Sequence, residues 1–331
     1  MLPSYTETGS TGIYQLKRLW AKNLLNQQGE PSELALDSAL LDLLGLGLLP
    51  SFRFLHEKKP SFEVFENWVS SHHGGSVPNE LVQQCNALFI QTVHNKTQQE
   101  ANRVVDTLTE NDLLFWEKNG YVIIREAISP SDCKASRDAI CSFLQVNEHE
   151  PTTWYNNLQL LEGIMVTLYR HPALDKNRAS SKIRRAYEQI WKRNDLIVTT
   201  DKTGFNPPET DSFNYRGIGL HWDVSLATPI PFGTQGILYL TDTKPHQGAL
   251  TLVPGFQNKI EQWLNHLPKN INPREVDFSK DAIPIGANAG DFIIWHHALP
   301  HSSSPNRAEH PRIVQYMNWY APTNEVQEKW I

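Results

Sequence analysis

The second half of the chain is a succession of short strand-like segments, and this pattern limits the possible fold more than any other feature of the sequence. The segments are bounded by Gly, Pro or Asn and include DLIVTT (195–200), GILYLTDT (236–243), GALTLVPG (248–255), GDFIIWHHALPH (290–301) and RIVQYMNWY (312–320). Short strands at fairly even spacing, with turn residues between them, are typical of an all-β sandwich or barrel. We therefore expect a β-core here, with the Pro/Gly/Asn-rich stretch TGFNPPETDSFNYRGIG (203–219) as a loop within it.

The first hundred residues show helical periodicity instead. Ser32 can cap a helix that runs through LALDSALLDLL and stops at Gly45. Ser61 opens a second helix and Asn79 a third. Their apolar faces carry Phe62, Phe65, Trp68, Leu81, Leu88 and Phe89. Such faces are costly to expose to water, so we expect them to be buried against the β-core, against each other or against a second subunit.

These patterns divide the chain into a helical N-terminal region (1–105) and a second domain (106–331). Thr109 can cap a short helix that ends at Gly120, and YVIIR (121–125) is typical of a strand. Two further helices are predicted before the β-core, one from Cys133 to about Leu144 and one around Ile183–Trp191. The second domain thus begins with mixed elements and continues as strands.

Composition argues against several classes of partner. A net charge of -6 and a pI near 6.1 give no reason to expect nucleic acid or an anionic membrane. Cys85, Cys133 and Cys141 are an odd number without zinc or redox spacing, which favours buried thiols in a reducing compartment. The apolar stretch from Leu34 to Leu49 is short for a membrane span, and the N-terminus lacks signal-peptide features. We expect a soluble, cytoplasmic protein that acts on a small molecule.

The tripeptide His221-Trp222-Asp223 suggests metal chemistry. In a strand, residues i and i+2 point to the same face, so this imidazole and carboxylate can converge on one ion. A third ligand must then come from a distant strand. Two histidines and one carboxylate on one face of a metal leave positions open, as in non-haem Fe(II) oxygenases. The tripeptide alone occurs in many proteins, so the remainder of the constellation decides its meaning.

The C-terminal part of the chain supplies that remainder. His301 is followed by Ser303, by Asn306 and, eleven residues on, by Arg312. A guanidinium on a neighbouring strand can clamp the distal carboxylate of a keto-diacid through two parallel hydrogen bonds, and the Ser303 hydroxyl can add a third. The metal would meanwhile chelate the keto-acid end of the same molecule.

With these residues in view, residues 112–322 resemble the phytanoyl-CoA dioxygenase family of Fe(II)/2-oxoglutarate oxygenases. The matching segments are FWEKNGYVIIREAISPSD, HWD, GALTLVPG and GDFIIWHHALPHSSSPNRAEHPR. The resemblance implies an α+β protein with a double-stranded β-helix (jelly-roll, cupin-like) core, flanking helices and a helical N-terminal region. It also implies Fe(II) held by His221, Asp223 and His301, 2-oxoglutarate bound by Arg312 and Ser303, and dioxygen (O2) as co-substrate. The expected reaction is hydroxylation of a small organic metabolite with release of succinate and CO2.

Other residues compete for these roles. His296 and His297 lie in the same predicted strand as His301, but they do not meet the family's spacing to Arg312, so we expect them to line or pack near the site. Arg307 falls in the turn after Asn306, whereas Arg312 begins an apolar strand and can point inward. Thr200 matches a position at which family members often contact 2-oxoglutarate; ordinary strand packing is the alternative. Tyr239 is a weaker candidate, Asp291 is interpreted as structural, and His246, His266 and His310 are expected to be solvated.

Two alternatives from other classes stay open at this point. The protein could be an inactive binding module, or a zinc- or nickel-dependent hydrolase or isomerase on a cupin-like barrel. An assay for succinate formation separates the first from an oxygenase, and metal analysis under anaerobic conditions separates the second. The helical N-terminal region has no counterpart in the family pattern. We expect it to pack on the outside of the β-core, to help shape the mouth of the pocket, or to mediate formation of a homo-oligomer.

Overall fold

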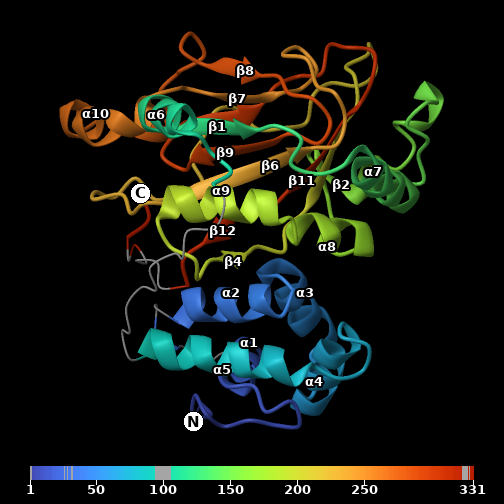
Figure 1. Ribbon diagram of the computed structural model, residues 1–331, viewed down its shortest axis with the longest axis vertical. Coiled ribbons are helices and arrows are strands. Elements are labelled where there is room, and N and C mark those ends of the chain that lie inside the picture. Colours follow the sequence, from blue (N-terminus) through green and yellow to red (C-terminus); the bar gives the residue numbers. More distant parts are fainter. Residues whose placement is uncertain are drawn as a thin grey trace. The chain divides into compact units, whose positions relative to one another are not determined.

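The structure is a computed structural model that describes residues 2–25, 27, 29–30, 33–93, 106–322, 327 and 329–331. Its chain forms two compact units (Figure 1). The first unit combines residues 1–101 with the segments 193–200 and 319–328, and the second combines residues 102–192, 201–318 and 329–331. Both are built by segments that lie far apart in the sequence.

The first unit is a helical bundle with a two-stranded ribbon. Its elements are α1 (Leu16–Leu24), α2 (Glu33–Leu43), α3 (Leu48–Lys58), α4 (Phe62–Ser71), α5 (Asn79–Val93), β4 (Ile197–Val198) and β12 (Trp319–Tyr320). The predicted helices are confirmed in α2, α4 and α5, and Ser61 caps α4 by accepting a bond from the N–H of Val64 at 3.3 Å. The predicted Ser32 cap lies outside the described residues. The predicted stop near Gly45 is confirmed: α2 ends at Leu43, the chain turns at Gly45 and Gly47, both at positive φ, and the apolar stretch from Leu34 to Leu49 continues into the start of α3.

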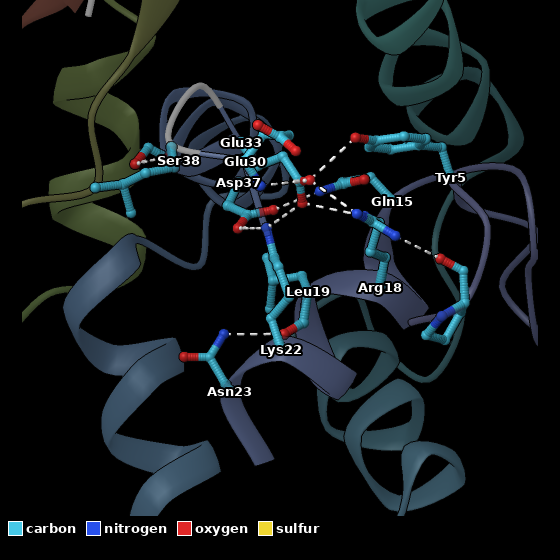
Figure 2. A network of polar contacts seen from close by, with 12 residues as sticks. Tyr5, Gln15, Arg18, Leu19, Lys22, Asn23, Glu30, Glu33, Asp37 and Ser38 are labelled. Atoms are coloured by element: carbon cyan, nitrogen blue, oxygen red, sulfur yellow. Dashed lines mark hydrogen bonds and ion pairs between the residues drawn. The ribbon is translucent and has the colours of Figure 1, made fainter. Parts of the chain in front are cut away.

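A buried polar network ties the N-terminal segment to α2 (Figure 2). Glu33 accepts hydrogen bonds from Arg18 Nη2 at 2.9 Å, Lys22 Nζ at 2.7 Å and the Tyr5 hydroxyl at 3.0 Å. Lys22 also donates to Asp37 Oδ2 at 2.6 Å. Burial alone would raise the pKa of Glu33, but the bonds from Arg18 and Lys22 hold it well below its usual range. Two cations and two carboxylates balance here, which is what allows them to be buried together.

The second unit contains two antiparallel sheets. The larger sheet has the order β1-β9-β6-β11-β5-β3-β2 and the smaller one β10-β7-β8. The strands are β1 (Tyr121–Ile124), β2 (Leu161–Glu162), β3 (Met165–Val166), β5 (Thr203–Asn206), β6 (Thr234–Tyr239), β7 (Leu250–Leu252), β8 (Ile283–Ile285), β9 (Phe292–His296), β10 (His301–Ser303) and β11 (Arg312–Tyr316). The helices are α6 (Glu110–Asn119), α7 (Pro130–Leu144), α8 (Pro172–Arg178), α9 (Ser181–Trp191) and α10 (Ile260–His266).

Alternation along the strands places the main core between the two sheets. Ile237 and Tyr239 of β6 share one buried cluster with Leu250 and Leu252 of β7, and with Ile285 of β8. The next residues along β6 point the other way, toward the helices. There the rings of Tyr187 in α9 and Phe292 in β9 lie 6.0 Å apart, and α9 runs along that face of the larger sheet (Figure 1). The helices therefore cover one face of the larger sheet, and the other face is turned toward the smaller sheet.

The start of the second unit follows the prediction. Thr109 and Asp112 form a capping box at α6, the helix ends at Gly120 (φ 74), and β1 follows at once. The predicted helix near Cys133 is α7, capped by Ser129. Cys85, Cys133 and Cys141 are buried free thiols, and burial raises the pKa of Cys85 to about 12.

Several predictions about strands were wrong, and RIVQYMNWY (312–320) is divided between β11 and β12, which belong to different sheets. The start of the Pro/Gly/Asn-rich stretch is not a loop but β5, a fully buried strand between β11 and β3. Its Gly204 packs so closely that a Cβ would lie 2.8 Å from Val314 Cγ2, so a glycine marks close packing here rather than a turn. The segment 290–301 is not one strand either: β9 and β10 belong to different sheets and are joined by a turn.

Within the part of the chain that the structure describes, no single helix has the length and apolar character needed to cross a membrane. The helices α2 and α3 pass such a test only together, as a pair bent by 99°.

Candidate metal centre

Three side chains that are predicted as metal ligands meet at one point. The ligand atoms of His221, Asp223 and His301 all lie within 4.8 Å of one another. His221 Nε2 is 3.5 Å from Asp223 Oδ1, and His301 Nε2 is 3.2 Å from Asp223 Oδ2. Two imidazoles and one carboxylate on one side of an ion are a donor set that suits Fe(II) and leaves further positions open.

The route by which they meet differs from the prediction. His221-Trp222-Asp223 does not lie in a strand: His221 forms an isolated antiparallel bridge with His301, and Asp223 follows in a bend. The two backbone bonds of that bridge, each 3.0 Å, bring the two imidazoles to the same place. Arg274 then holds the bend, because it donates to the carbonyls of Trp222 at 2.9 Å and Val224 at 2.7 Å, on either side of Asp223.

Backbone carbonyls orient both imidazoles. Nδ1 of His221 lies 2.8 Å from the carbonyl oxygen of Gly219, and Nδ1 of His301 lies 3.0 Å from that of Leu299. A carbonyl oxygen only accepts, so each Nδ1 carries a proton, and Nε2 is the ring nitrogen that is left to bind a metal once it releases its own proton, as metal binding requires. Both Nε2 atoms face Asp223. The two rings are thus preset as ligands by residues two positions away in the sequence.

The carboxylate of Asp223 is held in its charged form. Burial would raise its pKa, but hydrogen bonds with His221 and His301 bring the pKa far below its usual range. Gln235, in β6, donates a further bond from Nε2 to Asp223 Oδ2 at 2.6 Å. A carboxylate with this environment is a ready ligand for a divalent cation.

Arg312 forms a second feature of the site. It lies on β11, is fully buried, and donates from Nη1 to Ser303 Oγ at 3.0 Å and from Nη2 to the Tyr316 hydroxyl at 3.3 Å. Among the residues that the structure describes, no carboxylate lies within ion-pair distance of this guanidinium, and its Nε is buried without a hydrogen-bond acceptor. A guanidinium stays charged at any physiological pH, and a buried charge without a counter-charge is costly. The arrangement fits an anionic ligand that is supplied from outside the chain.

A cavity of about 570 Å³ reaches from the three ligands to the residues that contact Arg312, although Arg312 itself is not among its lining residues. Its lining includes His221, Asp223 and His301, as well as Ser303 and Tyr316, which hold Arg312. This volume is typical of a site for a small molecule. Apolar wall is supplied by Ile164, Met165, Ile218, Ile237, Leu250, Trp295 and Met317.

The competing residues take other places. His297 Nε2 lies 2.6 Å from the carbonyl oxygen of Pro231, and His296 Nδ1 accepts from the N–H of Ala298 at 3.1 Å. The Tyr239 hydroxyl donates to the carbonyl of Ile285 at 3.0 Å and accepts from the N–H of Leu250 at 2.8 Å, so it is used in packing. Arg307 is exposed. Asp291 is buried and bonded to Arg125 at 2.6 Å, as expected of a structural residue.

Thr200 belongs to the first unit, where its N–H donates to Asp42 Oδ1 at 2.9 Å. The described residues that line the cavity do not include it. Its contact with 2-oxoglutarate therefore stays a prediction. Asn306, part of the family spacing, holds the turn before β11: its Nδ2 donates to the carbonyls of Asn206 at 2.8 Å and His310 at 2.9 Å.

Three residues of the site were missed in the sequence. Gln235 had a weak signal, because it is the polar member of the inward-facing series that continues with Ile237 and Tyr239. Tyr316 lies four residues beyond Arg312 on the same strand face, which alternation could have indicated. Nothing in the sequence indicated Arg274, since it reaches the Trp222 carbonyl from a segment far along the chain.

Comparison with known proteins relates most of the second unit to one family. The sequence profile of the family described as Phytanoyl-CoA dioxygenase (PhyH) matches residues 116–314. A curated protein of Dictyostelium discoideum, named "Putative phytanoyl-CoA dioxygenase", is 20% identical over 268 residues, which cover 65% of this chain and 76% of that protein.

Solved structures of other proteins match part of this chain. EctD from S. alaskensis in its apoform is 14% identical, with a TM-score of 0.50 over 70% of this chain and 83% of its own. AviO1 from Streptomyces viridochromogenes Tue57 is 15% identical, with a TM-score of 0.49 over 67% of this chain and 99% of its own. The comparison with EctD shows that the compared region shares its fold.

Proposed function

Since this chain belongs to the phytanoyl-CoA dioxygenase family, we propose that it is an Fe(II)- and 2-oxoglutarate-dependent dioxygenase that hydroxylates a small organic metabolite. In this proposal the two sheets of the second unit are the halves of a double-stranded β-helix. His221, Asp223 and His301 hold the iron, and Arg312 with Ser303 binds the distal carboxylate of 2-oxoglutarate.

The observation that carries the proposal is the buried, uncompensated charge of Arg312 beside a His-Asp-His cluster. A carboxylate bound there in the two-pronged manner would neutralise the guanidinium and use its free Nε. A zinc or nickel hydrolase would have no evident use for such an arginine. An inactive binding module would have no need for both histidines to present Nε2 toward Asp223.

When bound, iron supplies the activation of dioxygen that is coupled to decarboxylation of 2-oxoglutarate. The overall balance is one substrate, one 2-oxoglutarate and one O2 converted to hydroxylated substrate, succinate and CO2. The residues of the chain orient these molecules and exclude water. Gln235 and Arg274 keep Asp223 in place, and the apolar wall that includes Trp295 lies next to the reacting centre.

The test is turnover of 2-oxoglutarate by the full chain with Fe(II), first without substrate and then with a panel of small metabolites. Succinate should form in an iron- and O2-dependent manner, and one class of metabolite should gain the mass of one oxygen atom. Absence of succinate under all conditions, or full activity with zinc in the absence of O2, would contradict the proposal.

A further inference from the structure

One carboxylate in the cavity has no use in the chemistry described so far. Asp201 lines the cavity, close enough to Asp223 for the two carboxylates to repel each other. Its Oδ1 accepts one bond, from the N–H of Lys202 at 2.7 Å. No described cation forms an ion pair with it. Burial raises the pKa of Asp201, as expected for a carboxylate that has lost contact with water and accepts a single hydrogen bond within the chain.

Two cations attract the Asp201 carboxylate, and each forms its ion pair with another residue; Arg178 Nη2 also donates to the backbone carbonyl of Asp201 at 3.1 Å. Lys202 forms an ion pair with Glu162. Arg178 pairs with Asp175 at 2.8 Å and donates to the carbonyl of Tyr169, also at 2.8 Å. Neither side chain makes an ion pair with the Asp201 carboxylate. The negative charge of Asp201 is therefore open to a ligand in the cavity.

Strand register separates Asp201 from Arg312 along the sheet. Arg312 is opposite Asn206 in the β11–β5 pair, and pairing runs on in the antiparallel sense until the N–H of Tyr316 meets the carbonyl of Lys202 at 3.1 Å. From Asn206 to Asp201 are five residue steps of extended chain, or roughly 16 Å. A 2-oxoglutarate anchored at Arg312 therefore leaves Asp201 for the substrate.

Charge balance indicates which substrate suits this part of the cavity. With Fe(II) and 2-oxoglutarate bound, the positive charges come from the metal and Arg312, and both histidines are neutral. They would balance the negative charges of Asp223 and of the two cosubstrate carboxylates. The Asp201 carboxylate would remain without an ion pair of its own among the described residues. Ile164, Met165 and Met317 supply apolar surface in the same cavity, which suits a carbon skeleton.

From this geometry we propose that Asp201 binds a protonated amine of the substrate, so that the enzyme oxidises a small, amine-bearing metabolite. This inference rests on the proposed function, because it assigns the part of the cavity that 2-oxoglutarate leaves free. The ammonium group would donate to Asp201, and the attached alkyl chain would lie along the apolar wall toward the metal. Asp201 is then the residue that selects the charge of the substrate.

The test compares three probes of one shape and different charge: hexylammonium, 1-hexanol and hexanoate. Each is titrated calorimetrically, without oxygen, into the full chain loaded with Fe(II) and 2-oxoglutarate. Hexylammonium should bind about ten-fold or more tightly than 1-hexanol, because a hydrogen bond to a charged group in a desolvated site is worth that much. Hexanoate should bind most weakly. Asp201→Asn, which keeps the shape but removes the charge, should bring hexylammonium and 1-hexanol to similar affinities.

Asp211→Asn is the matched control, since it removes the same charge from an exposed residue outside the cavity lining. It should leave the preference for hexylammonium unchanged. The inference is wrong if the wild type shows no preference, binds none of the probes, or keeps its preference in Asp201→Asn. Titration of 2-oxoglutarate itself separates failure of the proposed function from failure of the role of Asp201. If 2-oxoglutarate does not bind the wild type, the proposed function is wrong. If 2-oxoglutarate binds but the three probes show no charge preference, only the role of Asp201 is wrong.

Discussion

Gln235 and Asp223 are joined by a hydrogen bond whose direction is set by a third side chain. Gln235 Nε2 donates to Asp223 Oδ2 at 2.6 Å, while its Oε1 accepts from the indole Nε1 of Trp295 at 3.0 Å. Because the indole can only donate, the amide cannot flip without losing both bonds. Gln235 therefore fixes one oxygen of Asp223 and directs the rotamer of the carboxylate, although it is not a ligand itself.

We predict that Gln235→Ala lowers affinity for Fe(II) by about ten-fold to a hundred-fold, as loss of an outer contact to a metal ligand does in other proteins. Affinity is measured by anaerobic titration of the full chain with Fe(II). Gln159→Ala, on the exposed surface, is the control and should bind iron like the wild type. Equal iron affinity in Gln235→Ala would show that Asp223 needs no such support.

A second prediction concerns the choice among the histidines near the site. His301→Ala should abolish both iron binding and succinate formation, and so should His221→Ala or Asp223→Ala. His297→Ala should retain nearly all metal affinity, because the His297 ring contacts the carbonyl of Pro231 and lies outside the cluster of ligand atoms. Metal content after dialysis checks this directly. Loss of iron in His297→Ala with retention in His301→Ala would reverse the assignment.

Arg312→Lys should raise the concentration of 2-oxoglutarate needed for half-maximal succinate formation by roughly ten-fold or more, because lysine keeps the charge but loses the planar fork. Lysine also cannot hold Ser303 and Tyr316 at the same time with the geometry that Arg312 uses. Arg307→Lys, an exposed arginine five positions earlier, is the matched control and should leave the requirement unchanged. An unaltered requirement in both Arg312→Lys and Arg312→Ala would remove Arg312 from the cosubstrate site.

The parts of this site that are visible in the sequence are those encoded by short motifs. His221 and Asp223 are two residues apart, and the spacing from His301 to Arg312 spans one turn and one strand. The same holds for α6, where Thr109 and Gly120 mark both ends. In each case local chemistry and the final fold agree.

The parts that could not be predicted depend on distant partners. Arg274 lies 52 residues from the carbonyl of Trp222, and Gln235 acquires its role only when β6 brings it beside Asp223. The strand β5 was read as a loop because Gly204 and the following prolines are turn residues by composition. Its pairing with β11 and β3 overrides that tendency. The proposed role of Asp201 likewise could not be predicted, because its position relative to Arg312 follows only from the register of these strands.

His296 predicts a pH dependence of stability. Burial, and then the neighbouring His297, lower the pKa of His296 to about 3, below its usual value of about 6.5. The unfolded chain thus binds a proton between these values that the folded chain does not, so folding stability from this group is present above about pH 6.5 and is lost as the pH falls toward 3. His296→Gln keeps an acceptor for the Ala298 N–H and does not titrate. Its unfolding free energy should fall less steeply on acidification than that of the wild type; equal slopes in denaturant titrations would contradict this.

Removal of the helical N-terminal region, by starting the chain at Asp106, should impair the protein without destroying the metal site. The first unit includes β4 and β12, which such a chain retains, together with helices that it lacks. Ile197 of β4 packs with Ala39 of α2, and the Tyr320 hydroxyl of β12 donates to Asp42 at 2.8 Å, so truncation strips partners from both strands. We therefore expect aggregation or loss of substrate turnover.

Any folded fraction should still bind Fe(II) and 2-oxoglutarate in anaerobic titrations, because the proposed iron ligands, Arg312 and Ser303 all lie beyond residue 220. Asp42→Ala in the full-length chain is a milder test, because it removes the hydrogen bond from Tyr320 while keeping every helix. A truncated protein that is soluble, monomeric and fully active on the native substrate would refute this view of the N-terminal region.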